Sequence, residues 1–207
     1  MCKFLPHWSF ECSAAARRVA MPPPVTLIRD EDRTRVPWKN GAGITAELAA
    51  DDSWRVSVAD LGEAPSLFSA FAGRARIFTV VGDHGVTFDV DGSQSQIAPL
   101  TPYAFDGALT PTCIPDGPTS ALNIMVDDVT STAAVQVVVL QESSFTTAPD
   151  SVTAIYLHSG RARSGHTDIC PGDCLLVRED SIEITGTATI LVAEIRKSPH
   201  RTHATTA

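Results

Sequence analysis

The sequence predicts an all-β protein built from two small barrels. Short apolar segments recur along the 207 residues, clusters of turn-forming residues separate them, and no window shows the sustained periodicity of a capped helix. Fourteen prolines and thirteen glycines suit the many tight connections that such an architecture needs. A chain of this length can form one large β domain or two small barrels that share a core.

The first half of the chain holds the clearest strand signals. Residues 54–59 alternate large apolar side chains with polar or small ones, as expected for a strand with two different faces. Asp91-Gly92 is the strongest hairpin signal, because both residue types tolerate the positive φ of a tight turn. A short helical turn is expected within residues 61–71. Apolar or β-branched runs predict further strands at residues 76–81, 86–90, 121–126 and 133–140.

The second half repeats this pattern. Residues 152–157 predict a strand, and residues 158–160 (His-Ser-Gly) predict a turn. Residues 171–173 form a Pro-Gly-Asp turn of the kind that is typical of cupin barrels. Further strands are expected at residues 174–177, 181–185 and 189–196, with Gly186 between the last two. Together the halves predict double-stranded β-helix barrels of the RmlC-like cupin type, two in tandem, which is a bicupin.

The boundary between the two barrels is expected in residues 127–132, whose small and polar side chains are typical of a connector. Met21 is followed by three prolines and resembles a second start, so the segment before it is interpreted as an extension outside the fold. The division predicted is a disordered or spurious extension at residues 1–20, a first barrel with the pocket at 21–127, a second, degenerate barrel at 128–197, and a disordered tail at 198–207.

Charge and hydropathy exclude several classes of partner. The formal net charge is -8 and the pI is about 5.1, and no run of Lys or Arg forms a basic patch, which argues against a nucleic-acid partner. No apolar stretch approaches the roughly 20 residues that cross a bilayer, which argues against a membrane partner. Charged residues at positions 3, 11, 17 and 18 interrupt any signal-peptide core. We therefore expect a cytoplasmic protein.

The histidines and cysteines do not predict a metal site. None of the six histidines forms the His-x-His pair with a nearby Glu that a metal cupin presents, although His158 and His166 flank a possible hairpin. The five cysteines include no Cys-x-x-Cys pair, and Cys170 and Cys174 lack further partners that could complete a tetrahedral site. The sequence therefore predicts no metal and no cofactor.

Residues 38–47 concentrate the side chains that could carry chemistry. The segment reads Trp-Lys-Asn-Gly-Ala-Gly-Ile-Thr-Ala-Glu, and strand alternation puts Thr45 and Glu47 on one face. The strand that follows puts Arg55 and Ser57 on one face. Such polar faces can point outward to water or inward to a cavity. If they meet inside one barrel, they predict a site for an anionic or amide-bearing small molecule.

These residues resemble the HutD/Ves family of bacterial cupin-like proteins, which are often linked to histidine utilisation. The resemblance covers residues 36–125, and the second half fits only at the level of fold. Two departures are Ala42, where the family usually has a glycine, and Ala121, where an Asp is expected two residues before Asn123. The matching positions are Trp38 to Gly43, Thr45, Glu47, Trp54, Arg55, Ser57, Ala59, Phe68, Ser69, Phe71, Gly73, Arg76, Phe105, Gly107, Asn123 and Met125.

The resemblance implies a bicupin without a catalytic metal and with a pocket for a small carboxylate in its first barrel. Formate, N-formylglutamate and urocanate are the ligands that it suggests, and the role that it suggests is regulation of histidine catabolism or of a stress response. Arg55 and Arg76 would pair with the ligand carboxylate. The complete set of ligand-binding residues expected is Lys39, Asn40, Thr45, Glu47, Arg55, Ser57, Arg76 and Asn123.

Two other functions remain open at this point. A metal-free isomerase or hydrolase acting on a small acid would use Glu47 as general base and Lys39 as acid or electrostatic stabiliser. A scaffold that works as a homodimer would need no ligand. The aromatic side chains near the motif are expected in the core rather than at a ligand; they are Trp38, Phe68, Phe71 and Phe105.

Overall fold

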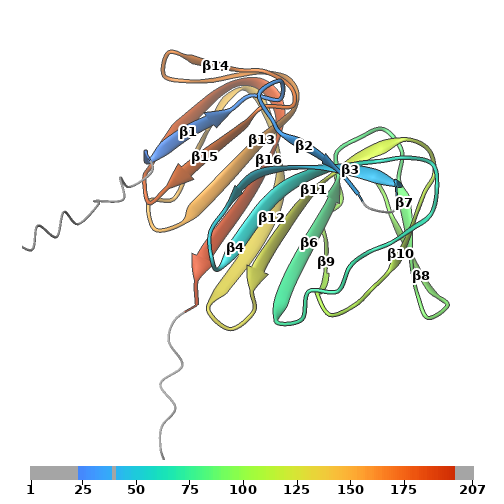
Figure 1. The fold of residues 1–207 in the computed structure, drawn as a ribbon. Helices are drawn as coiled ribbons and strands as arrows, with labels where there is room; N and C mark the ends of the chain where they lie inside the picture. Colours follow the sequence, from blue (N-terminus) through green and yellow to red (C-terminus); the bar gives the residue numbers. More distant parts are fainter. Residues whose placement is uncertain (1–22, 39–40, 199–207) are drawn as a thin grey trace, which may run out of the picture.

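The computed structural model describes residues 23–38 and 41–198. The regular secondary structure in these ranges consists of β-strands (Figure 1). These ranges contain no helix, and therefore no helix that could cross a membrane. The strands are β1 (Val25–Ile28), β2 (Arg35–Pro37), β3 (Gly43–Ala50), β4 (Trp54–Leu61), β5 (Ser66–Leu67), β6 (Arg74–Val80), β7 (Val86–Val90), β8 (Ser93–Ile97), β9 (Tyr103–Asp106), β10 (Thr112–Pro115), β11 (Thr119–Asp127), β12 (Ser131–Thr146), β13 (Val152–Ser164), β14 (Thr167–Ile169), β15 (Cys174–Arg178) and β16 (Glu183–Lys197).

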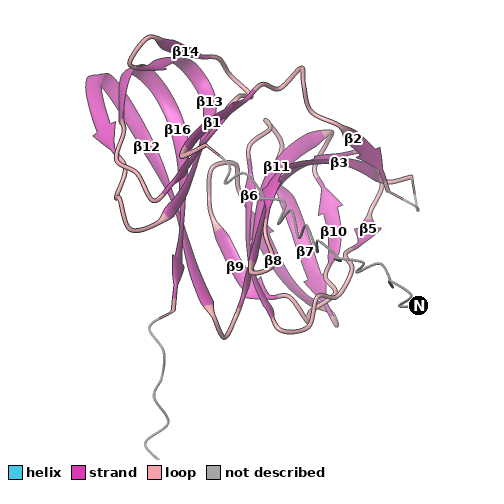
Figure 2. Cartoon of the chain, turned by 60° about the vertical axis from the view of Figure 1, so that its left-hand side comes forward, coloured by secondary structure: helices cyan, strands magenta, loops and turns pink. Residues whose placement is uncertain are grey.

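The strands form three sheets, which we call central, small and bent. The central sheet has the order β2-β3-β4-β11-β6-β9, and the small sheet has the order β5-β10-β7-β8. The bent sheet has the order β1-β15-β13-β16-β12, with β14 paired to β13. The central sheet lies between the other two (Figure 2).

An aromatic core joins the small sheet to the central sheet. Phe78 of β6 and Phe88 of β7 are fully buried, and their ring centroids are 4.9 Å apart. Phe68 packs against Phe88 at a centroid distance of 5.3 Å with its ring nearly perpendicular. These tilted and edge-on arrangements are the ones that aromatic quadrupoles favour.

The opposite face of the central sheet packs on the bent sheet. Val56 and Ile124 on the central side meet Leu176 and Leu191 on the bent side, and all four are at most 1% exposed. β4 and β11 are therefore covered on one face by the bent sheet, and their large apolar side chains alternate with polar or small ones on the other face. The two halves of the chain share this core.

The bent sheet curves because its three long strands change direction without losing their pairing. β12 and β13 each contain a bulge, between Gln141 and Ser143 and between Leu157 and Ser159. Gly160 has φ +88° and lies so close to β16 that an added Cβ would overlap the carbonyl oxygen of Thr187. A second apolar core, which includes Leu157, fills the concave side of the sheet.

Three local predictions are wrong, and the bend explains two of them. The turn expected at residues 158–160 lies inside β13, and the strands expected at 181–185 and 189–196 are parts of one strand, β16. Bulges and glycines let a paired strand turn a corner, so these glycines do not end the strands. The helical turn expected within residues 61–71 is absent; that range holds the end of β4, a loop and β5.

Most of the other strand predictions are confirmed. The segments expected at 54–59, 121–126 and 152–157 lie within β4, β11 and β13, and the Asp91-Gly92 hairpin joins β7 to β8 with positive φ at both residues. β1 pairs with β15, with Leu27 opposite Leu175; in the predicted division, residues 25–28 belong to the first barrel (21–127) and β15 to the second (128–197). Figure 1 shows β1 (blue) and β15 (orange) side by side.

Candidate ligand-binding site

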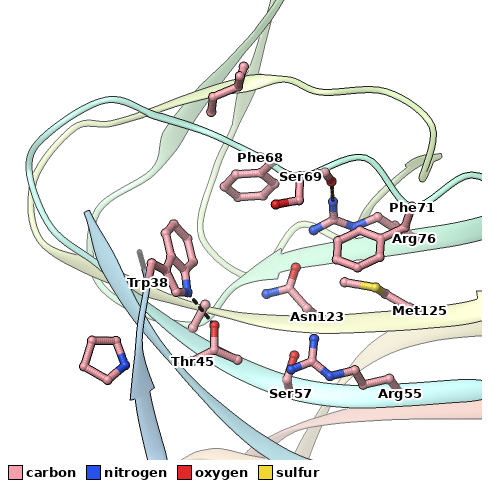
Figure 3. A pocket seen from close by; sticks show the side chains of 13 residues that line it. Trp38, Thr45, Arg55, Ser57, Phe68, Ser69, Phe71, Arg76, Asn123 and Met125 are labelled. Carbon is pink, nitrogen blue, oxygen red and sulfur yellow. Dashed lines mark hydrogen bonds between the residues drawn. The ribbon is translucent and has the colours of Figure 1, made fainter. Parts of the chain in front are cut away.

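A cavity of about 560 Å³ lies between the central sheet and the loop that follows β5 (Figure 3). Its floor comes from neighbouring strands: Thr45 on β3, Arg55 and Ser57 on β4, Asn123 on β11 and Arg76 on β6. The complete lining is Pro37, Trp38, Thr45, Arg55, Ser57, Ala59, Leu67, Phe68, Ser69, Phe71, Arg76, Asn123 and Met125.

Strand register brings these side chains together. Ser57 lies opposite Asn123 across the β4–β11 pair, and Met125 lies opposite both Arg55 and Arg76 on its two neighbouring strands. Side chains alternate in a strand, so the residues between them, such as Ile124, point to the bent sheet. The central sheet therefore presents a partly polar face to the cavity and an apolar face to the core.

Arg76 is a buried cation surrounded by aromatic rings. It is 5% exposed, and its guanidinium carbon lies 4.8, 5.2 and 5.6 Å from the ring centroids of Phe105, Phe68 and Phe71. Its Nη1 donates a long hydrogen bond of 3.5 Å to the carbonyl oxygen of Ser69, and its Nε has no partner among the described residues. No carboxylate within those residues forms an ion pair with it.

The burial of Arg76 changes its acidity. Desolvation, with a smaller contribution from the positive charge of Arg55, lowers the pKa of Arg76 to about 10. Burial penalises the charged form of a basic side chain unless a counter-ion is present. Arg76 is thus a site of uncompensated positive charge in the cavity wall.

Arg55 differs from Arg76 because it has a carboxylate partner. Its Nε donates a hydrogen bond of 2.8 Å to Oε2 of Glu47, and the two side chains are 34% and 53% exposed. Glu47 lies beside the cavity and does not line it. The register of β3 with β4 shifts between Glu47 and Ala49, so the strand pairing is irregular directly after Glu47.

Trp38 closes one end of the cavity. Its Nε1 donates a hydrogen bond of 2.6 Å to the hydroxyl oxygen of Thr45. Gly43 makes this packing possible, because an added Cβ would lie 3.1 Å from the indole ring and 2.7 Å from the carbonyl oxygen of Asp60. Ala42 does not have the positive φ that would require a glycine, so the departure from the family motif is accommodated there.

Asn123 is a buried amide at the centre of the floor. It is 7% exposed, and its Nδ2 donates one long hydrogen bond of 3.4 Å to the carbonyl oxygen of Ala121. Ala121 itself is fully buried in the aromatic core, where an Asp would be without solvent. In Figure 3 the Asn123 side chain lies between the guanidinium groups of Arg76 and Arg55.

The cavity contains most of the residues expected from the sequence. The structure brings together Thr45, Arg55, Ser57, Arg76 and Asn123, and it places Glu47 against Arg55. Lys39 and Asn40 lie outside the described residues, so their place at the ligand, and the role of Lys39 as acid or electrostatic stabiliser in an enzyme, stay predictions.

Other lining residues were not expected at a ligand. Trp38, Phe68 and Phe71 line the cavity, whereas the sequence interpretation assigned them to the core; Phe68 belongs to both. Met125 could have been found by strand alternation, since it is two residues from Asn123 and shares its face. Ser69 faces the cavity from a loop, where no periodic signal exists.

The described part of the chain holds no cluster of three or more His, Cys, Asp or Glu side chains suited to a metal ion. Burial raises the pKa of the Cys113 and Cys174 thiols to about 12 each, so both stay protonated at neutral pH and are poor nucleophiles. The polar side chains that line the cavity, such as Arg76, Arg55 and Asn123, can donate hydrogen bonds, which suits the binding of an anion.

Comparisons with known proteins agree on one family. The HutD family model matches residues 30–194. A curated Pseudomonas putida protein, described as an uncharacterized 21.2 kDa protein in the hutC 3' region, is 40% identical over 95 residues, which are 42% of this chain and 50% of that protein. The match thus spans half the length of this relative.

Solved structures support the same relationship. HutD from Pseudomonas fluorescens, solved in a formate condition, has a TM-score of 0.74 and 29% identity over 84% of this chain and 100% of its own. A cupin 2 conserved barrel domain protein from Leptotrichia buccalis has a TM-score of 0.56 with 7% identity over 75% of this chain and 89% of its own, which is a likeness of fold alone.

Proposed function

This chain belongs to the HutD family, and we propose that it binds a small carboxylate in the cavity through Arg76, using side chains rather than a metal. The observation that carries the proposal is the buried guanidinium of Arg76 in the cavity wall: the residue is 5% exposed, has no carboxylate partner among the described residues, and has an Nε without a hydrogen bond. A buried charge without a partner is costly, and a charged partner that arrives with a ligand removes that cost. An arginine also matches the planar geometry of a carboxylate.

The rest of the lining suits a small organic acid. The hydroxyls of Thr45 and Ser57 and the amide of Asn123 offer hydrogen bonds to polar atoms, while Phe68 and Phe71 offer apolar contact. The cavity volume of about 560 Å³ lies within the range of small-molecule sites, roughly 300–1,000 Å³. Lys39 and Asn40 would complete the polar set.

The ligands proposed are formate, N-formylglutamate or urocanate, and the role proposed is regulation of histidine catabolism or of a stress response in the cytoplasm. Two relatives support this choice: the Pseudomonas putida protein lies in the hutC 3' region, and the Pseudomonas fluorescens HutD was studied in a formate condition. We also propose that the fold is a bicupin, in which the small and central sheets form one barrel and the bent sheet forms a second, degenerate one.

Replacement of Arg76 by Met tests the function. Calorimetric titration with formate, urocanate and N-formylglutamate should give saturable binding to the natural protein with and without a chelator. Arg76→Met should weaken binding by at least about 30-fold, because loss of one partner from a buried charge pair costs about 2–5 kcal/mol. The variant should fold, since Met replaces a buried charge with apolar atoms of similar length.

Arg178→Met is the matched control. Arg178 of β15 also has a buried nitrogen without a partner, and it lies outside the cavity lining. It should bind like the natural protein. Binding that survives Arg76→Met, or that Arg178→Met weakens equally, would refute the assignment of the carboxylate to Arg76.

A further inference from the structure

We propose that Glu47 makes the cavity selective for monoanions, so that Arg76 takes the ligand's single carboxylate while Arg55, held by Glu47, donates to an uncharged acceptor at the other end. This inference rests on the proposed function, because it presupposes that a carboxylate binds at Arg76. It adds a specificity-determining residue that does not itself line the cavity.

The charges around the cavity favour one negative charge. Among the residues that the structure describes, the lining contains two cations, Arg55 and Arg76, and no acidic side chain. Glu47 neutralises Arg55 through the 2.8 Å bond to its Nε, whereas Arg76 has no carboxylate partner among the described residues. The described residues of the cavity therefore hold one uncompensated positive charge, at Arg76, which a monocarboxylate balances and a dicarboxylate exceeds.

The geometry of Arg55 indicates what it offers to a ligand. Glu47 accepts the hydrogen bond from Nε, and the two terminal nitrogens of Arg55 make no hydrogen bond to the described residues. Figure 3 shows the guanidinium of Arg55 next to the Asn123 amide, on the other side of that amide from Arg76. The terminal nitrogens and Asn123 can therefore donate to an acceptor at the far end of a ligand whose carboxylate lies at Arg76.

A second carboxylate at that far end would meet two opposing effects. Arg55 would attract it, and Glu47, bonded to the same guanidinium, would repel it. A neutral amide, carbonyl or ring nitrogen would keep the hydrogen bonds from Arg55 without this repulsion. Because both side chains are partly exposed, at 34% and 53%, solvent screens the repulsion, and we expect a preference of about ten-fold rather than exclusion.

The aromatic lining further restricts the ligand class. Phe68, Phe71 and Trp38 line the cavity, and the two phenylalanines contact the guanidinium of Arg76. Flat, unsaturated carbon skeletons make the best contact with such rings. The predicted class is a planar, unsaturated monocarboxylate with an uncharged hydrogen-bond acceptor at its opposite end. Of the ligands proposed above, urocanate belongs to this class, whereas N-formylglutamate carries two carboxylates and should bind less tightly.

Fumarate and its monoamide test this selectivity, because they have the same shape and differ by one negative charge. In calorimetric titrations of the full chain at neutral pH, the monoamide should bind about ten-fold more tightly than fumarate. Glu47→Gln keeps the hydrogen-bond acceptor and removes the charge, and it should abolish or invert this ratio by strengthening fumarate binding.

Glu194→Gln is the control for the change in net charge. Glu194 accepts a hydrogen bond of 3.1 Å from Arg196 on β16, so it belongs to a similar ion pair outside the cavity lining. It should leave the ratio of the two affinities unchanged. Formate serves as the reference ligand for Arg76 in all three proteins.

The outcomes separate the two proposals. If formate binds and the monoamide-to-fumarate ratio is the same in the natural protein and in Glu47→Gln, the charge selection by Glu47 is refuted while the carboxylate site stands. If formate, fumarate and the monoamide all fail to bind, both proposals are refuted. If Glu47→Gln does not fold, tighter binding of fumarate than of the monoamide by the natural protein refutes the selectivity.

Discussion

Arg76 is held by aromatic rings where a surface arginine would be held by water or a carboxylate. Its guanidinium lies within 6 Å of three ring centroids, and each such contact contributes roughly 0.5–2 kcal/mol. The desolvation of a buried cation costs several kcal/mol. The rings offset this cost without supplying a negative charge, so the arginine can still pair with an incoming anion.

The lowered pKa of Arg76 predicts proton uptake on binding. In the free protein its pKa is about 10, so the side chain is about half deprotonated at pH 10. A bound carboxylate favours the charged form and raises that pKa, so binding at pH 10 should take up as much as about half a proton per site. Affinity should accordingly fall as the pH rises through about 10.

Calorimetric titration in two buffers of different ionisation enthalpy measures this uptake. The heats should differ between the buffers at pH 10 and agree at pH 7.5, where Arg76 is charged in both states. Lys39→Gln should retain the difference, which separates Arg76 from the lysine of the motif. Equal heats in both buffers at pH 10 would contradict the assignment of the uptake to Arg76.

Sequence reasoning could predict some of the cavity residues but not the state of Arg76. Alternation along one predicted strand placed Arg55 and Ser57 on the same face, and in the structure both side chains line the cavity. The burial of Arg76 depends on Phe68 and Phe105, which come from separate segments of the chain. A strand arginine is normally solvated, so only the fold shows that this one is not.

The bend of β13 and β16 depends on two glycines, Gly160 and Gly186, which lie two register positions apart on the paired strands. An added Cβ at Gly160 would overlap the Thr187 carbonyl, and one at Gly186 would overlap the Arg161 carbonyl. The register pairs Gly160 with Ala188 and Gly186 with Ala162. The backbones approach closely at this point, which lets both strands turn around the apolar core without losing their partners.

Alanine substitutions at Gly160 and Gly165 should have different effects. Both glycines have positive φ, of +88° and +56°, but nothing lies within 4 Å of a Cβ added at Gly165. Gly165→Ala should lower the free energy of unfolding by about 1 kcal/mol, the cost of positive φ alone. Gly160→Ala should lower it by about 3 kcal/mol or more, because the backbone overlap adds to the strain.

Denaturant unfolding followed by circular dichroism measures both values. Equal losses at the two positions would contradict the account of the bend. The positions of these strands were predictable from their apolar residues. Their continuity through Gly160 and Gly186 was not, because a glycine that bends a strand and a glycine that ends one look alike in sequence.

At the scale of the whole molecule, the central sheet connects the cavity to the rest of the fold. One face of β4 and β11 packs on the bent sheet, and the other face changes from apolar core near Ala59 and Ala121 to polar cavity floor at Ser57 and Asn123. The floor therefore lies on a rigid support, as precise ligand binding requires.

The all-β class was predictable because it follows from local patterns of alternation and turns. The pairing of β1 with β15 was not predictable in this way. Its paired residues, such as Ile28 and Cys174, are 146 positions apart in the sequence, and no local pattern signals their contact. A linear division of the chain also cannot reveal that Val56 and Leu191 share one core. Such contacts depend on tertiary packing rather than on local propensity.

The most direct test of the account observes the unpaired Nε of Arg76 itself. In a nitrogen–proton NMR spectrum of the arginine Nε groups, assigned by comparison with Arg76→Met, saturation with formate should shift the Arg76 signal strongly and the Arg178 signal little. That result is predicted because the Arg76 Nε gains a charged partner in the complex. Formate binding that leaves the Arg76 signal unchanged would contradict the claim that this buried, unpaired arginine is the carboxylate site.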